Sequence, residues 1–207
     1  MPGHLRVAPT RLTLLRLQRR HKTLVSADAL LERKRQVLGQ MLAALMPRWR
    51  ARRAEAYGTL ATAYQSFGLT RMRSSGSELR QVVGGMAPMV TVAWRRRIIS
   101  GVSTFEAACE AAPLRPRFGL LGTTAELDRT VALLRDAIAS LAELAALEAS
   151  LRSLANALEK TNRQVRTLRD WLIPVHEATI RWIADTLEEQ ERGYLFQLKR
   201  LTKESPS

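Results

Sequence analysis

Two long stretches of helical hydrophobic spacing, one in each half of the chain, limit what this sequence can fold into. From Leu144 to Trp182, steps of three and four residues meet an apolar side chain at ten of twelve positions. From Leu14 to Trp49 the same steps meet one at eight of eleven. The three exceptions there are His21, Asp28 and Arg35. Heptad spacing is typical of helices that bury one narrow face against a partner helix, so the sequence predicts two long amphipathic helices.

The first helix is predicted to run from about Thr10 into the low seventies, where a polar stretch over 71–77 weakens the pattern. After Trp49 the phase of the spacing slips, and a second apolar stripe continues along the helix. This stripe consists of Tyr57, Leu60, Tyr64 and Phe67. Pro47 lies inside the helix and removes one backbone hydrogen bond, which predicts a kink or a join between two helices.

The second helix has a clear predicted start. Gly119 and Gly122 indicate a loop, and residues 123–126 read Thr-Thr-Ala-Glu, which fits a capping box that satisfies the first free amides of a helix. Pro174 interrupts the helix, but the apolar spacing resumes at Ile180. We therefore expect a kink at Pro174 rather than the end of the helix.

Neither helix can bury its apolar face alone, so the simplest fold is an antiparallel hairpin with both chain termini at one end. The predicted fold class is mainly all-α: a long antiparallel two-helix coiled coil with a small insert at its far end. A register that pairs residue i with roughly 200 to 210 minus i places an acidic group opposite the basic stretch 11–22. The acidic group is Glu188, Glu189 and Glu191.

The predicted insert covers residues 76–122 and differs from its surroundings. Gly84, Gly85 and Pro88 break helices, and residues 89–94 have the composition of a strand. A cationic run follows, formed by Arg95, Arg96 and Arg97. We expect a short β-hairpin or small knob, which divides the chain into a first helix over 1–75, the insert over 76–122 and a second helix over 123–207.

Composition excludes several classes of protein. The 207 residues contain one cysteine, Cys109, so neither an intrachain disulfide nor a cysteine-based zinc site is available. No apolar run approaches the roughly 18 residues of a membrane-spanning helix, and the N-terminus lacks the apolar core of a signal peptide. We therefore expect a soluble, cytoplasmic chain with no direct membrane span, although a peripheral position at a membrane stays open.

The positive charge is concentrated in the first third of the chain. The net charge is +14, and residues 1–75 contain 15 Lys and Arg against 3 Asp and Glu. Such a segment suits a phosphate backbone, an anionic membrane or an acidic protein partner. Because the 28 Arg far exceed the 5 Lys, a coding bias toward Arg explains the excess equally well. A solvated edge is likewise the simpler interpretation of Arg95, Arg96 and Arg97.

The sequence shows no catalytic site, metal site or cofactor site. The Gly-rich segments at 84–85 and 119–122 lack the lysine of a phosphate-binding loop. His176 and Glu177 begin like a zinc-protease helix, but Ile180 stands where the second histidine is needed. We therefore expect a binding or mechanical element that is not an enzyme and holds no cofactor.

The order of short segments along the whole chain resembles the central-stalk D subunit of V-type and A-type rotary ATPases. In the first half, residues 9–11, 14–20 and 30–35 resemble the N-terminal helix of that family. The second half is closer still. Its matching residues are 120–123, 154–155, 159–161, 173–174, 180, 183, 188, 191–192 and 196–199. The chain departs from the family's usual Arg-Arg-Val-Asn-Ala-Leu-Glu at residues 163–169, where Arg166 and Arg169 replace the Asn and the Glu.

The resemblance implies a rotor shaft that couples ATP hydrolysis or synthesis to ion transport. Its terminal end would enter the ring of catalytic A and B subunits, its middle would bind the F subunit of the central stalk, and its insert end would meet the subunit that caps the membrane rotor ring. The candidate ring contacts are Arg11, Arg16, Arg19, Arg20, Lys22, Glu188, Glu191 and Arg192. The candidate insert-end contacts are Arg95, Arg96 and Arg97. The chain would then be a peripheral part of a membrane-bound assembly.

Two other classes of function stay open at this point. An Arg-rich coiled coil could bind nucleic acid by neutralising phosphates, but no groove-reading or RNA-reading motif is present and aromatic residues do not alternate with the basic run, so we expect no nucleic-acid partner. A general scaffold would not require the ordered segments of the second half. Co-purification distinguishes these three classes of function. A rotor is recovered together with A, B and F subunits, and a nucleic-acid binder is recovered with nuclease-sensitive material.

Overall fold

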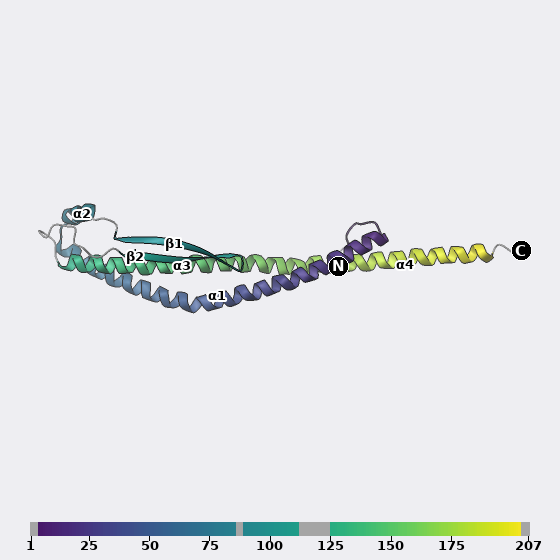
Figure 1. The fold of residues 1–207 in the computed structure, drawn as a ribbon, viewed down its shortest axis with the longest axis horizontal. Coiled ribbons are helices and arrows are strands. Elements are labelled where there is room, and N and C mark those ends of the chain that lie inside the picture. The colour runs from purple at the N-terminus through teal and green to yellow at the C-terminus, as the bar shows by residue number, and fades with distance from the viewer. Residues whose placement is uncertain (1–3, 86–88, 112–124, 204–207) are drawn as a thin grey trace. The chain divides into compact units, whose positions relative to one another are not determined.

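A computed structural model describes residues 4–85, 89–111 and 125–203, and these are mostly helical (Figure 1). The elements are α1 (Arg11–Arg73), α2 (Gly76–Gly85), β1 (Val90–Ile99), β2 (Val102–Ala111), α3 (Ala125–Thr167), the π-helical turn η1 (Leu168–Leu172) and α4 (Ile173–Lys203). The chain divides into two compact units. Unit 1 consists of Met1–Val37 and Leu158–Ser207, and unit 2 of Leu38–Ala157. The predicted division at 75/76 and 122/123 stays a prediction.

In unit 1 the two ends of the chain pair in antiparallel fashion. This agrees with the prediction from the two rows of heptad-spaced residues, 14–49 and 144–182, which we call the seams. Arg11 forms an ion pair with Glu191, and further along α1 the Asp28 carboxylate lies 3.0 Å from Arg169. The interior is built from seam positions and their neighbours. These are Leu17, Thr161, Val165, Val175, Thr179 and Ile183, all at most 7% exposed. The mainly all-α fold class with long terminal helices is therefore confirmed.

The helix around Pro174 changes hydrogen-bonding pattern without ending. Proline cannot donate a backbone hydrogen bond, and its ring crowds the carbonyl four residues earlier. Just before it, η1 forms a π turn in which the Ile173 N–H donates to the carbonyl of Leu168. This wider turn carries the chain past the proline, so the helical path continues into α4. Likewise α1 continues through Pro47 as one helix, without the alternative join.

In unit 2, α1 and α3 pack through small side chains. Ala56 and Ala63 of α1 are completely buried, and Ala137 of α3 is 1% exposed. The two tyrosines of the stripe expected to continue the seam lie mostly outside this contact, with Tyr57 55% and Tyr64 63% exposed, whereas Leu60 is half-buried. Small residues let helix backbones approach closely, which moves the buried row one position away from the aromatic row.

Hydroxyl groups satisfy one another along the same contact. Thr59 Oγ1 lies 3.0 Å from Ser140 Oγ, and the buried Thr130 Oγ1 lies 2.7 Å from Ser66 Oγ and 2.8 Å from Thr70 Oγ1. Buried hydroxyls are tolerated where each finds a hydrogen-bond partner. At the end of this row Arg73 forms an ion pair with Glu126. Of the predicted capping box at 123–126, Thr123 and Thr124 lie outside the described residues.

The insert contains the expected hairpin and an additional helix. β1 and β2 pair antiparallel from Val90 opposite Ala111 to Ile99 opposite Val102, around a turn in which Ser100 and Gly101 have φ of 52° and 76°. These left-handed values suit a tight two-residue hairpin turn. The hairpin lies along α3 in Figure 1, where the Phe105 N–H donates to Ser150 Oγ at 2.7 Å.

Helix α2 lies where the sequence predicts only the start of a knob, although a recognisable signal precedes it. The Ser75 N–H donates to Glu78 Oε2 at 2.9 Å, and the Glu78 N–H donates back to Ser75 Oγ at 3.4 Å. This reciprocal pair is a capping box, which satisfies amides at a helix start. The glycines at 84 and 85 end the helix rather than exclude it.

Candidate functional site

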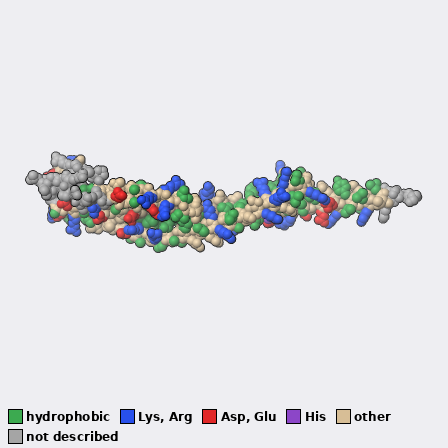
Figure 2. Space-filling view, in the orientation of Figure 1, with side chains coloured by type: hydrophobic (Ala, Val, Ile, Leu, Met, Phe, Trp, Pro, Cys, Tyr) green, Lys and Arg blue, Asp and Glu red, His purple; other side chains and the backbone are tan. Residues whose placement is uncertain are grey.

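The predicted ring-contact residues on α1 point outward from unit 1. All five basic side chains of the group are exposed, while Leu17 between them is 7% exposed. The five are Arg11, Arg16, Arg19, Arg20 and Lys22. Figure 2 shows Lys and Arg side chains gathered on the visible face of this unit. A helix that buries one apolar row therefore displays a basic surface on its other sides.

The acidic residues of the predicted group meet only the beginning of this basic surface. Glu191 pairs with Arg11, whereas Glu188 accepts a hydrogen bond from Arg192 Nη2 at 2.6 Å on its own helix. His21 already lies opposite Glu177, with 3.7 Å between Nε2 and Oε1. The register therefore lies at the lower edge of the predicted range, and most of the basic stretch lies away from these glutamates.

Beyond Glu191, α4 carries an apolar surface that the sequence alone does not single out as a site. Five large apolar side chains there are between 59% and 71% exposed. They are Tyr194, Leu195, Phe196, Leu198 and Leu201. Helix α1 begins at Arg11, which already pairs with Glu191, so α4 continues beyond the start of its partner. Large exposed apolar groups are typical of surfaces that bind another molecule.

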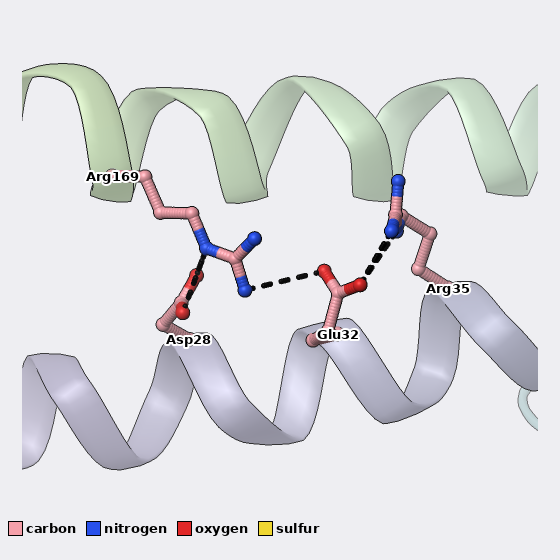
Figure 3. A network of polar contacts seen from close by, with 4 residues as sticks. All are labelled: Asp28, Glu32, Arg35 and Arg169. Atoms are coloured by element: carbon pink, nitrogen blue, oxygen red, sulfur yellow. Dashed lines mark hydrogen bonds and ion pairs between the residues drawn. The ribbon is translucent and has the colours of Figure 1, made fainter.

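A charged network joins the two helices of unit 1 (Figure 3). The Arg169 Nε donates to both carboxylate oxygens of Asp28 at 3.0 Å, and its Nη2 lies 3.4 Å from Glu32 Oε2. Glu32 also accepts from Arg35 Nε at 3.1 Å on its own helix. The hydrogen bond that Arg169 donates to Asp28, followed by the negative charges of Asp28 and Glu32, raises the pKa of Arg169. Arg169 therefore holds the register of the two helices as a fixed cation.

The predicted insert-end arginines lie on the exposed strand β1. Arg96 Nε donates to Ser103 Oγ at 2.9 Å, and Arg97 Nη1 donates to Glu106 Oε1 at 3.0 Å, both across the hairpin. Arg95 is exposed and lies opposite Glu106 in the strand register. The apolar side chains beside this run, Trp94 and Ile98, are 55% and 69% exposed. Two of the three arginines thus contact the hairpin itself.

The histidine that begins the protease-like motif has a structural environment. His176 is 3% exposed, and its Nδ1 lies 2.8 Å from the Leu172 carbonyl oxygen. Because a carbonyl oxygen only accepts, Nδ1 carries the proton in this contact. Within the part of the chain that the structure describes, no three His, Cys, Asp or Glu side chains gather as metal ligands. Among the described helices, none is long and apolar enough to span a membrane.

Comparison with known proteins assigns the family. The sequence matches the family of the ATP synthase D subunit over residues 13–203. The chain belongs to this family. It is similar to the V-type ATP synthase D subunit of Thermotoga neapolitana, with 30% identity over 94% of this chain and 96% of the relative. The V-type D subunit of Clostridioides difficile is 31% identical over 96% and 91% of the two chains. The A-type ATP synthase D subunit of Pyrococcus furiosus is 28% identical over 97% and 95%.

Membership in the D-subunit family gives the charged network a particular interest. Arg169 lies in the segment 163–169 that differs from the family pattern noted in the sequence, and its partners are Asp28 and Glu32. The sequence shows the substitution but not these partners. The only signal is Asp28 itself, a carboxylate at a seam position where an apolar residue is expected.

Proposed function

We propose that this chain is the central rotor shaft of a V/A-type rotary ATPase and itself performs no catalysis. It couples ATP hydrolysis or synthesis in a ring of A and B subunits to ion translocation across the membrane. The observation that carries the proposal is the family match over residues 13–203, which includes both helices of the antiparallel pair. Relatives from bacteria and archaea carry the names of V-type and A-type ATP synthase D subunits.

The mechanical part of the proposal follows from how a shaft acts on surrounding sites. A shaft with an asymmetric cross-section meets three equivalent binding sites differently, so its angle and their nucleotide occupancy bias one another. Torque passes only through helices that stay in register. In unit 1 the buried seam and the Arg169 network supply that constraint, because slippage of one helix along the other breaks both.

The ring contact belongs to the terminal end of unit 1. The exposed apolar residues of α4 beyond Glu191 suit an apolar sleeve that closes around the end of the shaft. The part of the ring next to this sleeve, which we call the collar, then faces the charged residues of the shaft. These are the basic residues from Arg11 to Lys22, together with Glu188, Glu191 and Arg192. Their attraction to acidic collar residues is screened and non-directional, which permits sliding.

Neutralising Arg16 and Arg20 should make coupling to the ring less dependent on salt, and an unchanged salt dependence contradicts the idea.

The contact with the F subunit belongs to the exposed aromatic row of α1 in unit 2. Tyr57 and Tyr64 are more than half exposed, and the Arg53 guanidinium lies 5.2 Å from the Trp49 ring centroid and 5.5 Å from that of Tyr57. Aromatic residues and arginine are enriched in the centres of protein interfaces. We assign this row to the F subunit because it combines exposed aromatic rings with a cation along one stretch of α1.

The insert end meets the subunit that caps the membrane rotor ring. Arg95, Arg96 and Arg97 of β1 lie beside exposed apolar side chains, which together suit an acidic and apolar partner surface. Through that subunit the shaft is attached peripherally to the membrane.

The experiment that tests the proposed function is co-expression with the A, B and F subunits encoded in the same genome. A tag on this chain should recover all three subunits in one complex, and the complex should hydrolyse ATP. The isolated chain should show no ATP hydrolysis. Recovery of the tagged chain without A and B, or nucleotide hydrolysis by the chain alone, overturns the proposal.

A further inference from the structure

The residues that precede α1 form an extended segment that folds back on α4. Residues 4–10 have no helical structure, and their burial alternates, with residues 5, 7 and 9 half-buried and residues 4, 6, 8 and 10 exposed. This period of two is that of an extended chain lying on a surface. We call residues 4–10 the strap.

The local sequence explains where the strap ends. Pro9 disfavours helical backbone at Ala8, so the strap stays extended at this point. Thr10 then caps α1, because its Oγ1 accepts the Thr13 N–H at 3.1 Å and its carbonyl accepts the Leu14 N–H at 2.9 Å. The chain therefore reverses at the start of α1 and leaves the strap beside α4.

Two contacts hold the strap on α4. The Leu5 N–H donates to Thr179 Oγ1 at 3.0 Å, and the same hydroxyl donates to the Val175 carbonyl at 2.7 Å. Thr179 is completely buried. The His4 ring lies on Trp182 with 4.8 Å between the ring centroids. A buried hydroxyl that accepts a backbone N–H from 174 residues away in the sequence fixes the position of that segment.

The strap lies at the edge of the α4 face that packs against α1, on the side away from the ion pairs with α1. The α4 residues that meet α1 at this level include Glu177, beside His21, and Glu191, beside Arg11. At about 100° per residue, Thr179 and Trp182 lie roughly a third of a turn or more away from both glutamates. This level of unit 1 therefore contains three segments, with the additional one on a single side.

We infer that the strap is the asymmetric contact surface through which the terminal end of the shaft engages acidic side chains of the surrounding subunits. The inference rests on the proposed function. The third segment lies on one side only, so it adds to the asymmetry of the two-helix cross-section at this level. The strap also displays the exposed Arg6, which extends the basic surface of α1 onto this side. Thr179 acts as a positioning residue, since it holds the strap without facing the partner.

The first experiment asks whether Thr179 holds the strap. The full chain offers a matched control, because Thr186 donates to the Trp182 carbonyl at the same 2.7 Å on the same helix. In Thr179→Val, hydrogen exchange at the Leu5 amide should rise about five-fold, the effect of one lost hydrogen bond. In Thr186→Val it should stay at the wild-type rate. Equal exchange rates in the two variants overturn the assignment of Thr179.

The second experiment asks whether the strap serves coupling, and uses the complex with A, B and F subunits. Thr179→Val and deletion of residues 2–8 should lower ATP turnover per complex several-fold, whereas Thr186→Val should not. Wild-type turnover in a complex whose strap is deleted overturns the inference and leaves the proposed function intact. Failure of the wild-type chain to assemble with A and B instead overturns the proposed function, while the exchange measurement still reports on the strap.

The third experiment tests the chemistry of the partner. Arg6→Glu should weaken retention of the shaft in the A and B ring at low salt about ten-fold, because the reversed charge faces acidic side chains. Arg6→Lys keeps the charge and should bind like the wild type. Both variants should show the wild-type exchange rate at Leu5, since the Arg6 side chain is exposed. Equal retention of Arg6→Glu and Arg6→Lys excludes an acidic partner at the strap.

Discussion

Arg169 shows how one side chain can fix the register of two helices. Its guanidinium reaches Asp28 and Glu32, which lie one turn apart on α1, and it does so from the π turn before Pro174 (Figure 3). The carboxylates are more buried than the arginine: the side chains of Asp28 and Glu32 are 16% and 20% exposed, against 48% for Arg169. Removal of the arginine therefore leaves the carboxylate of Asp28 without this cation, while Glu32 keeps its contact with Arg35.

Replacement of Arg169 should destabilise unit 1 more than replacement of a surface arginine. We expect Arg169→Gln to lower the thermal midpoint of the chain by a few degrees and Arg169→Lys to lower it less, because lysine keeps the charge but loses the forked geometry. Thermal unfolding followed by circular dichroism measures this. The control is Arg163→Gln, since Arg163 pairs across one turn with Glu159 and both side chains are well exposed, at 73% and 67%. An equal midpoint for the two Gln variants contradicts a role for the network.

The sequence does not reveal that these residues pair. Asp28 is visible as an interruption of the seam, but Arg169 lies in a π turn that shifts the side-chain phase relative to a regular α-helix. Heptad counting still predicts the buried row through the proline, since Val165, Val175 and Thr179 are buried, but it assigns no partner to a charged residue outside that row. The capping role of Ser75 is hidden for a simpler reason: the glycines that follow it resemble general breakers of structure, whereas they mark the end of a short helix.

At the scale of elements, the contact between α1 and α3 in unit 2 depends on side chains that are small. Ala56, Ala63 and Thr70 of α1 follow one another at seven-residue intervals and are all completely buried. A prediction from the size of the apolar side chains alone selects Tyr57 and Tyr64 as the buried residues of this contact instead. The spacing is therefore correctly predicted as helical, but the buried face is not, because closeness of the backbones rather than hydrophobicity selects the residues in this contact.

A larger side chain in the alanine row should separate the helices. Ala63→Leu forces a branched side chain into a fully buried site and should cost about 1–3 kcal/mol of unfolding free energy. Ala61→Leu makes the same chemical change at an exposed position of the same helix and should change it by less than ~0.5 kcal/mol. Urea unfolding of the two full-length variants measures the difference. Equal stability would mean that α1 and α3 do not pack through this row.

At the scale of the whole molecule, the sequence predicts the architecture far better than the contacts with partners. Two seams and the order of family segments are sufficient for two paired helices and a hairpin, because each helix must bury its own apolar face. Partner surfaces lack such a constraint, since their complement lies in another chain. The apolar end of α4 illustrates this: Tyr194, Leu198 and Leu201 continue the helical spacing, yet only the structure shows that α1 begins too late to cover them.

That uncovered end leads to a prediction that separates folding from function. Phe196 and Leu198 are 71% and 59% exposed, so the double variant Phe196→Ser with Leu198→Ser should unfold like the wild type to within ~0.5 kcal/mol. If a surrounding ring buries both side chains, the same variant loses about 1.5–3 kcal/mol of burial at each position, equivalent to roughly a hundred-fold or greater loss of affinity for the ring. Gln197→Ser, exposed between them, should affect neither quantity. Urea unfolding of the free chain measures the first effect, and titration of the shaft into the A and B ring measures the second. Normal ring affinity in the double variant would mean that the end of α4 lies outside the ring, because two large apolar side chains cannot be removed from a buried contact without loss of affinity.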